Sequence, residues 1–149
     1  MRRAAARLAL LALVAAAPAP TGDWVGAYDC AQGPTGLALH LDDAPDGSVR
    51  GVFFFYADPR NPGVPSGCFD MQGTWDAARR RLVLHAGQWL VRPFGFVGVD
   101  LAGQVAAGVL AGTVDGPGCT RFRLRPGLPP VPLPDACRPP PPPPAGPTV

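Results

Sequence analysis

Residues 48–56 read Ser-Val-Arg-Gly-Val-Phe-Phe-Phe-Tyr, and this stretch decides the fold class. β-branched and aromatic residues favour strands, and successive side chains of a strand point to opposite faces. Val49, Gly51, Phe53 and Phe55 share one face, whereas Arg50, Val52, Phe54 and Tyr56 share the other. Both faces are rich in apolar groups, so we expect a strand that is central in its sheet or covered on its second side.

The flanking sequence continues as short strands separated by turns. Leu37, Leu39 and Leu41 alternate with Ala38 and His40, which is the period of a half-buried strand. A long loop is predicted at 57–67 because its three prolines cannot lie inside a strand. Further strands are predicted at 69–75, 81–86, 94–101, 109–114 and 119–125. The spacing predicts an all-β fold, a small antiparallel barrel or sandwich of about eight strands.

The N-terminus has the pattern of a signal peptide. Arg2, Arg3 and Arg7 precede an apolar run at 8–17, and small residues follow it. An uncleaved anchor is the alternative, although ten residues are short of the about 20 that span a bilayer. We therefore expect a signal peptide at 1–20, a β domain at 21–125 and a proline-rich tail at 126–149. The mature chain should be exported to the periplasm, the cell envelope or the medium, with no stable membrane span.

Charge excludes one class of partner. The whole chain carries 13 Arg against 11 Asp, with no Lys and no Glu, and its net charge is +2. Loss of the three leader arginines leaves ten against eleven, a net charge of −1. A nearly neutral chain has no global electrostatic reason to bind nucleic acid.

Four cysteines remain in the mature chain, and an even number in a small exported domain favours two disulfides. Three pairings are possible. If the strands meander and close, the end of the first strand lies beside the start of the last. That arrangement favours Cys30 with Cys119 and leaves Cys68 for Cys137. The sequence contains no C-x-x-C spacing, which would indicate a redox or zinc site. We therefore expect neither a metal nor a cofactor.

The tail contains 12 prolines in its 24 residues. Such a composition favours polyproline II structure without a packed core, as in a spacer or a disordered end. The alternative is a ligand for a proline-recognising partner.

Two resemblances are visible. The opening Gly22-Asp23-Trp24-Val25-Gly26-Ala27-Tyr28, followed by alternating strands, resembles the start of a calycin barrel, the group of lipocalins and avidins. The pattern Trp24-x-Gly26-x-Tyr28-x-Cys30-x-Gln32-Gly33-x-Thr35-Gly36-Leu37 resembles a recurrent domain of exported bacterial proteins. The second resemblance extends over most of the β domain and implies a fold and a compartment but no reaction. It also implies that Cys68 and Cys137 are additions, which fits their pairing with each other.

Candidates for catalysis are few. A nucleophile beside a base would have to come from Ser48, Ser66, His40 and His85, and both histidines fall on outward strand faces. The carboxylates of Asp58, Asp70 and Asp100 form no pattern that selects a glycosidase pair. We therefore predict a protein that is not an enzyme.

Three features are candidates for binding. The first is the loop 58–70 with Arg60 and Asn61, for which the alternative is a pinned connection that covers one barrel end. The second is Trp89, Arg92 and Phe94, an aromatic pair beside an arginine, for which the alternative is that Trp89 and Phe94 are core. The third is a basic patch for anionic envelope polymers or lipid headgroups, built from Arg121, Arg123 and Arg125 together with Arg79, Arg80 and Arg81. The alternative there is a solvated strand face.

These observations favour a non-enzymatic secreted or cell-envelope β-barrel binding module. Its partner would be an envelope component or a protein that the sequence does not identify. The alternative function is a secreted inhibitor of a hydrolase, either a lysozyme or a protease.

Overall fold

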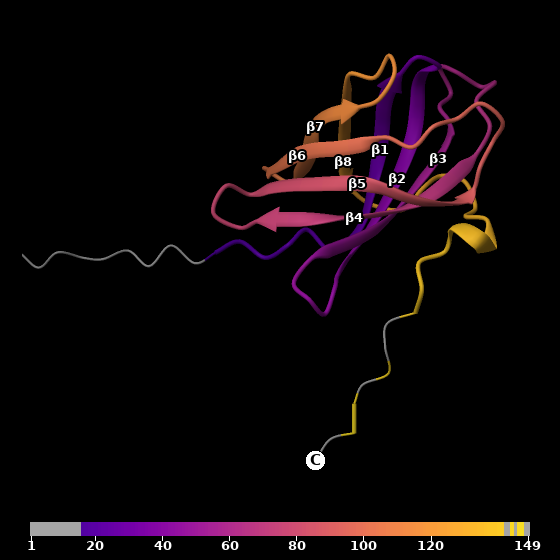
Figure 1. Cartoon of the computed structure of the whole chain (residues 1–149). Coiled ribbons are helices and arrows are strands. Elements are labelled where there is room, and N and C mark those ends of the chain that lie inside the picture. The colour runs from indigo at the N-terminus through magenta and orange to yellow at the C-terminus, as the bar shows by residue number, and fades with distance from the viewer. Residues whose placement is uncertain (1–15, 142–143, 145, 148–149) are drawn as a thin grey trace, which may run out of the picture.

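Eight antiparallel strands follow one another in chain order around a closed barrel (Figure 1). The computed structural model describes residues 16–141, 144, 146 and 147, so most of the predicted signal peptide lies outside the described residues. The strands are β1 (Gly22–Cys30), β2 (Gly33–Asp43), β3 (Val49–Ala57), β4 (Gly67–Asp76), β5 (Arg81–Val91), β6 (Asp100–Ala106), β7 (Val109–Asp115) and β8 (Arg121–Pro126). The all-β prediction is confirmed, and pairing of β1 with β8 makes the fold a barrel rather than a sandwich.

Strand direction alternates, so the connections gather at two ends of the barrel. Residues 31–32, 58–66, 92–99 and 116–120 form the loop end, and residues 44–48, 77–80 and 107–108 form the hairpin end. Closure brings the end of β1 to the start of β8, and a disulfide joins Cys30 to Cys119 there. A second disulfide joins Cys68 of β4 to Cys137. This is the pairing that a closed meander predicts.

Aromatic side chains fill the interior. Phe53 is fully buried, with the ring of Tyr28 edge-on at 5.1 Å and the ring of Phe69 stacked at 4.6 Å. Leucines of β2, β5, β6, β7 and β8 complete this cluster. At the hairpin end, the indole N–H of Trp24 donates to the carbonyl of Pro20, and that of Trp75 donates to the carbonyl of Ala17. The barrel is therefore packed with side chains rather than hollow.

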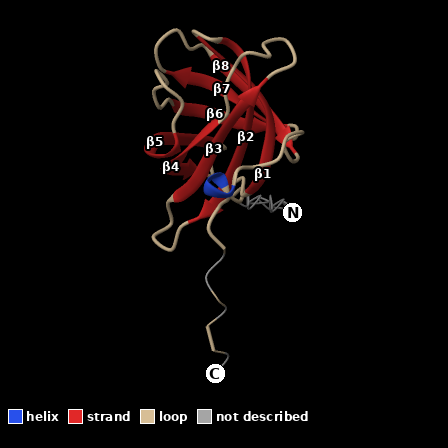
Figure 2. Cartoon of the chain, turned by 90° about the vertical axis from the view of Figure 1, so that its right-hand side faces the viewer, coloured by secondary structure: helices blue, strands red, loops and turns tan. Residues whose placement is uncertain are grey.

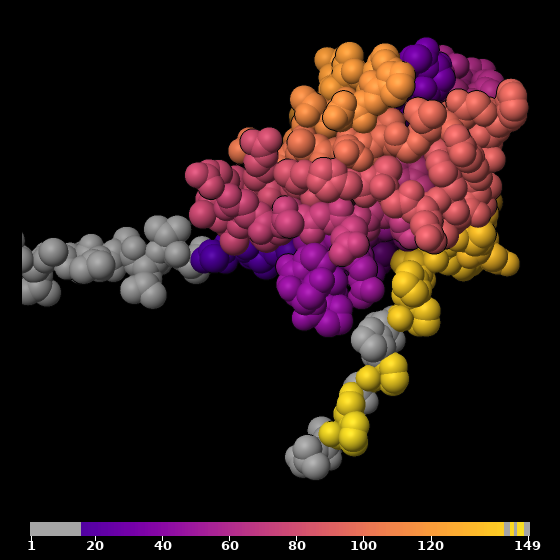
Figure 3. Space-filling view, in the orientation of Figure 1, coloured from indigo at the N-terminus to yellow at the C-terminus, as the bar shows by residue number. Residues whose placement is uncertain are grey.

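The second face of β3 is also covered, as the sequence predicts. Residues 127–138, which we name the strap, run along the outside of the barrel and end in the 3-10 helix η1 (Asp135–Cys137) (Figure 2). Val131 and Leu133 of the strap pack against an outer cluster of buried side chains. That cluster comprises Ala38, Val52, Phe54, Tyr56, Cys68 and Cys137. In space-filling view the yellow C-terminal segment lies directly against the barrel (Figure 3).

The strap corrects the prediction that the tail has no packed core. Residues 127–138 pack because apolar side chains stand between their prolines and because the disulfide holds Cys137 at Cys68. The described residues beyond 138 extend away from the barrel (Figure 1).

The strand predicted at 94–101 is also wrong. β5 runs on to Val91, residues 92–99 form a loop, and β6 begins at Asp100. Pro93 has no N–H for a strand ladder, and Gly95 has a φ of 81°, a left-handed conformation that favours glycine. The described residues include no helix long and apolar enough to cross a membrane.

Candidate functional site

Asn61 ties the loop 58–66 to the β1–β2 turn. Its side-chain amide donates to the carbonyl of Gln32 at 2.5 Å and to that of Pro34 at 3.2 Å. Its neighbour Arg60 pairs through two guanidinium nitrogens with Asp58, at 2.9 and 3.0 Å. These hydrogen bonds hold the pKa of the Asp58 carboxyl below its usual value. The loop is therefore pinned, Asn61 is structural, and Arg60 remains exposed.

Trp89 belongs to the edge of the core. Its ring meets Phe69 at 4.9 Å and Phe55 at 6.1 Å, both edge to face. The guanidinium carbon of Arg92 lies 5.6 Å from the Trp89 ring centroid, within the range of a cation–π contact. The alternative that Trp89 is core therefore holds, and Arg92 covers it from the solvent side.

Phe94 lies at the tip of the loop 92–99, which we name the apical loop, and is fully exposed. The core alternative fails for this residue. Phe96 braces the loop from below because its ring stacks on Phe55 at 5.1 Å. Arg92 Nε donates to the carbonyl of Phe96 at 3.0 Å, which ties the two sides of the loop together. The exposed apolar side chains Leu90 and Val97 lie at the base of the loop and within it.

A cavity of ≈ 250 Å³ lies beneath the apical loop at the loop end. Tyr28, Phe55, Phe69 and Phe96 contribute to its lining. Gln32 donates from its amide to the hydroxyl of Tyr28 at 3.2 Å, and burial raises the pKa of Tyr28 above its ordinary range. This space is smaller than the roughly 300–1,000 Å³ that is usual for small-molecule sites.

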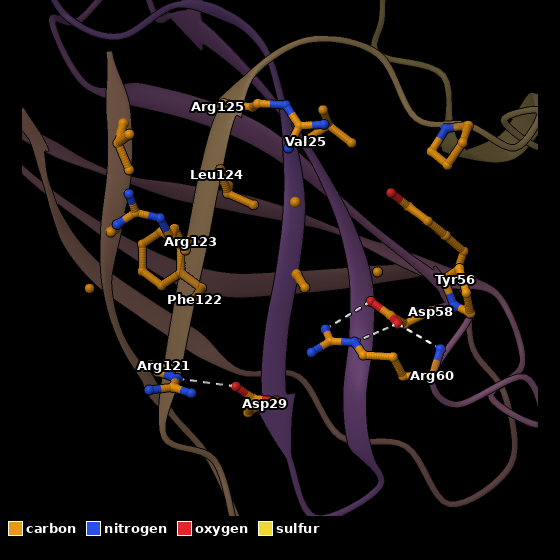
Figure 4. A pocket seen from close by; sticks show the side chains of 18 residues that line it. Val25, Asp29, Tyr56, Asp58, Arg60, Arg121, Phe122, Arg123, Leu124 and Arg125 are labelled. Atoms are coloured by element: carbon orange, nitrogen blue, oxygen red, sulfur yellow. Dashed lines mark hydrogen bonds and ion pairs between the residues drawn. The ribbon is translucent and has the colours of Figure 1, made fainter. Parts of the chain in front are cut away.

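A larger groove, which we name the outer groove, crosses the outside of the barrel over β8, β1 and β2 (Figure 4). Its volume is ≈ 870 Å³. One wall carries Arg121, Arg123 and Arg125, and the opposite wall carries Tyr56, Asp58 and Arg60 (Figure 4). Ala27 of β1 lies between the walls, and its small side chain leaves the space there open.

Arg60 and the β8 arginines are candidates from the sequence, whereas Tyr56 was not predicted as a site residue. The missed signal is pairing, because Tyr56 lies directly opposite Gly36 and its ring occupies the place of a side chain there. Arg79, Arg80 and Arg81 do not join this groove, since they lie at the β4–β5 turn and β6 and β7 separate them from β8. The single basic patch predicted from all six arginines is therefore wrong.

Both histidines contact aspartates. His40 lies between Asp23, at 2.8 Å from Nδ1, and Asp42, at 3.0 Å from Nε2. Partial burial lowers the pKa of His40, but the hydrogen bond to Asp23 and the charge of Asp42 outweigh it, so the pKa is raised overall. His85 contacts Asp100 at 2.9 Å. No hydroxyl group contacts either ring among residues that the structure describes, and these residues include no cluster of potential metal ligands.

Comparison of the chain with protein-family models, with curated proteins and with solved structures found no match in any of the three.

Proposed function

We propose that this protein is an exported, non-enzymatic binding module that recognises its partner through the apical loop. The observation that carries the proposal is the full exposure of Phe94 at the tip of a braced loop. Exposed aromatic side chains beside an arginine are typical of the residues that dominate binding energy at interfaces. Because Phe96 and Arg92 already hold the loop in shape, binding would order few additional groups.

The loop also indicates the chemistry of the partner surface. Phe94 would bind in an apolar pocket of the partner, and the exposed Arg92 would pair with a carboxylate beside that pocket. Val97 and Leu90 would add apolar contacts around this centre. A protein of the cell envelope with such a pocket is the partner that we propose.

Binding of the labelled mature protein to envelope fractions of its native host tests the proposal. Replacement Phe94→Ala should weaken binding about tenfold or more, which is the effect of losing roughly 1.4 kcal/mol. Leu128→Ala is the matched control because Leu128 is an exposed apolar residue of the strap, away from the apical loop. Equal binding by both variants would refute the proposal.

Inhibition of a hydrolase is the second candidate, and the shape of the loop end favours it. A single projecting side chain on a disulfide-held frame suits insertion into an enzyme cleft. Inhibition assays against a lysozyme and a set of serine proteases test this function. Phe94→Ala should abolish inhibition of the true target, whereas Leu128→Ala should leave it unchanged.

A further inference from the structure

We propose that the outer groove is a second binding site, independent of the apical loop, and that its ligand is a linear acidic polysaccharide. Such a chain carries carboxylates at intervals and hydroxyl groups between them. Three features of the groove favour this ligand: the distribution of charge, the spacing of the arginines along β8, and the acceptor groups in the groove.

Positive charge is concentrated in the outer groove. Four of the ten arginines beyond the leader line it, Arg60, Arg121, Arg123 and Arg125, together with only the aspartates Asp29 and Asp58. The groove lining therefore has a net charge of +2. The rest of the chain beyond the leader has six arginines and nine aspartates, a net charge of −3. An anionic ligand is thus attracted to this face and repelled by the rest of the molecule.

Two of the four guanidinium groups are available to a ligand. Arg60 is paired with Asp58, and Arg121 donates to Asp29 at 3.3 Å. Arg123 and Arg125 have no carboxylate partner among the described residues, and both are exposed. Guanidinium groups in this state bind carboxylates through paired, charge-assisted hydrogen bonds.

The arginines form a row rather than a cluster. Residues two apart on a strand point to the same face and are separated by about 7 Å. Arg121, Arg123 and Arg125 follow one another along β8 at this interval of the backbone (Figure 4). A single small anion would need groups that converge on one point, whereas a row suits an extended chain with repeated negative charges.

The opposite wall favours a ligand that has hydroxyl groups. Asp58 is an acceptor on this wall, and Tyr56 contributes a hydroxyl in the same groove. Asp29 is a second acceptor in the groove and lies beside Arg121. The carboxyl of Asp58 is ionised at neutral pH, and the hydrogen bonds from Arg60 hold its pKa below its usual value. These carboxylates would repel a polyphosphate, which has no hydroxyl groups to donate along its chain, but they accept hydrogen bonds from sugar hydroxyls.

The shape of the groove argues against two other anionic surfaces. Its middle is recessed because Ala27, between the walls, is small, so a flat lipid bilayer would touch only the walls. A single-stranded nucleic acid needs exposed aromatic faces for base stacking, and the ring of Tyr56 is buried against Gly36.

Titration of the mature protein with an oligogalacturonate, followed by calorimetry, tests the site. Arg123→Gln with Arg125→Gln should weaken binding about tenfold or more, a change of about 1.4 kcal/mol. The control is Arg80→Gln with Arg81→Gln, which removes the same charge from the β4–β5 turn. The affinity of this control variant for the oligogalacturonate should stay within about twofold of the wild-type value, although the variant has lost the same charge. A Tyr56→Phe variant removes only the hydroxyl and should weaken binding severalfold.

Four results would overturn the proposal. The first two are the absence of binding by the wild-type protein and an equal loss of affinity in both arginine double variants. The other two are binding of inorganic polyphosphate as tightly as the oligogalacturonate and binding of a neutral glucose oligomer. Circular dichroism of each variant verifies that the barrel is intact, and Phe94→Ala should bind the oligogalacturonate like the wild type.

Discussion

The disulfide between Cys68 and Cys137 holds the strap against the barrel, and replacing both cysteines by alanine tests this role. In the unfolded chain this bridge alone closes a loop of 69 residues. With Cys30–Cys119 intact, the shorter route between the two cysteines is about 56 residues long. The chain-entropy relation assigns about 4 kcal/mol to a loop of that length at 25 °C.

The variant should lose less than this full amount. Without the bridge the strap gains freedom in the folded state, because noncovalent contacts alone then hold it. They include the packing of Val131 and Leu133 on the outer cluster and the hydrogen bond that the Gly127 N–H donates to the carbonyl of Asp23. We therefore expect the free energy of unfolding to fall by about 2–4 kcal/mol, measured by urea unfolding at equilibrium.

Release of the strap has a second consequence. Val52, Phe54 and Tyr56 lose their cover, so binding of the dye ANS to the folded variant should increase. Removal of the other bridge, by Cys30→Ala with Cys119→Ala, is the matched control. The two bridges close a common ring of about 56 residues, so the control should lose a similar amount of stability without binding more ANS. Unchanged ANS binding in the Cys68–Cys137 variant, or an equal increase in the control, would refute the role of the strap.

Three further predictions follow from the barrel. Phe53→Ala should lower the free energy of unfolding by about 3–5 kcal/mol, because Phe53 is fully buried among aromatic rings; a loss below 1 kcal/mol in urea unfolding would contradict this packing. Asn61→Ala should cost about 1–3 kcal/mol and speed amide hydrogen exchange in the loop 58–66, because two carbonyl groups lose their donor; unchanged exchange would show that other contacts hold the loop. The raised pKa of His40 means that its stabilising effect is complete below pH about 6.5 and is lost as pH rises through the folded-state value. His40→Asn should therefore flatten the fall in stability as pH rises above about 6.5, and an unchanged slope in thermal unfolding would assign that fall to other groups.

Strand alternation made most of the fold predictable. The leucines of β2 follow the period of a half-buried strand. β-branched and aromatic residues on both faces of β3 indicate a strand that is covered on both sides. The same alternation and the even number of cysteines led to the observed disulfides. β6 escaped prediction because Ala102, Gly103 and Ala106 carry little strand preference of their own. It forms because β5 and β7 pair with it on both sides.

The candidate site was harder to predict because its parts come from distant segments. Residue type alone identified Arg60, Arg92 and Phe94, yet nothing local indicates that Arg60 lies in one surface and Phe94 in another. Tyr56 became part of the outer groove only through its position opposite Gly36. The strap was not predicted because its proline content is typical of an unpacked segment. Val131 and Leu133 pack between these prolines once the disulfide holds Cys137 at Cys68.

Site-specific photo-crosslinking in the native host would show whether the apical loop binds a partner. A photoreactive phenylalanine analogue at position 94 should capture one envelope protein. The same analogue at position 80, on the exposed β4–β5 turn, should not capture that protein. Arg92→Ala should be added to the variant with the analogue at position 94. Loss of the crosslink would then show that the loop as a whole makes the contact. Identical products at positions 94 and 80, or no product at 94, would contradict the account.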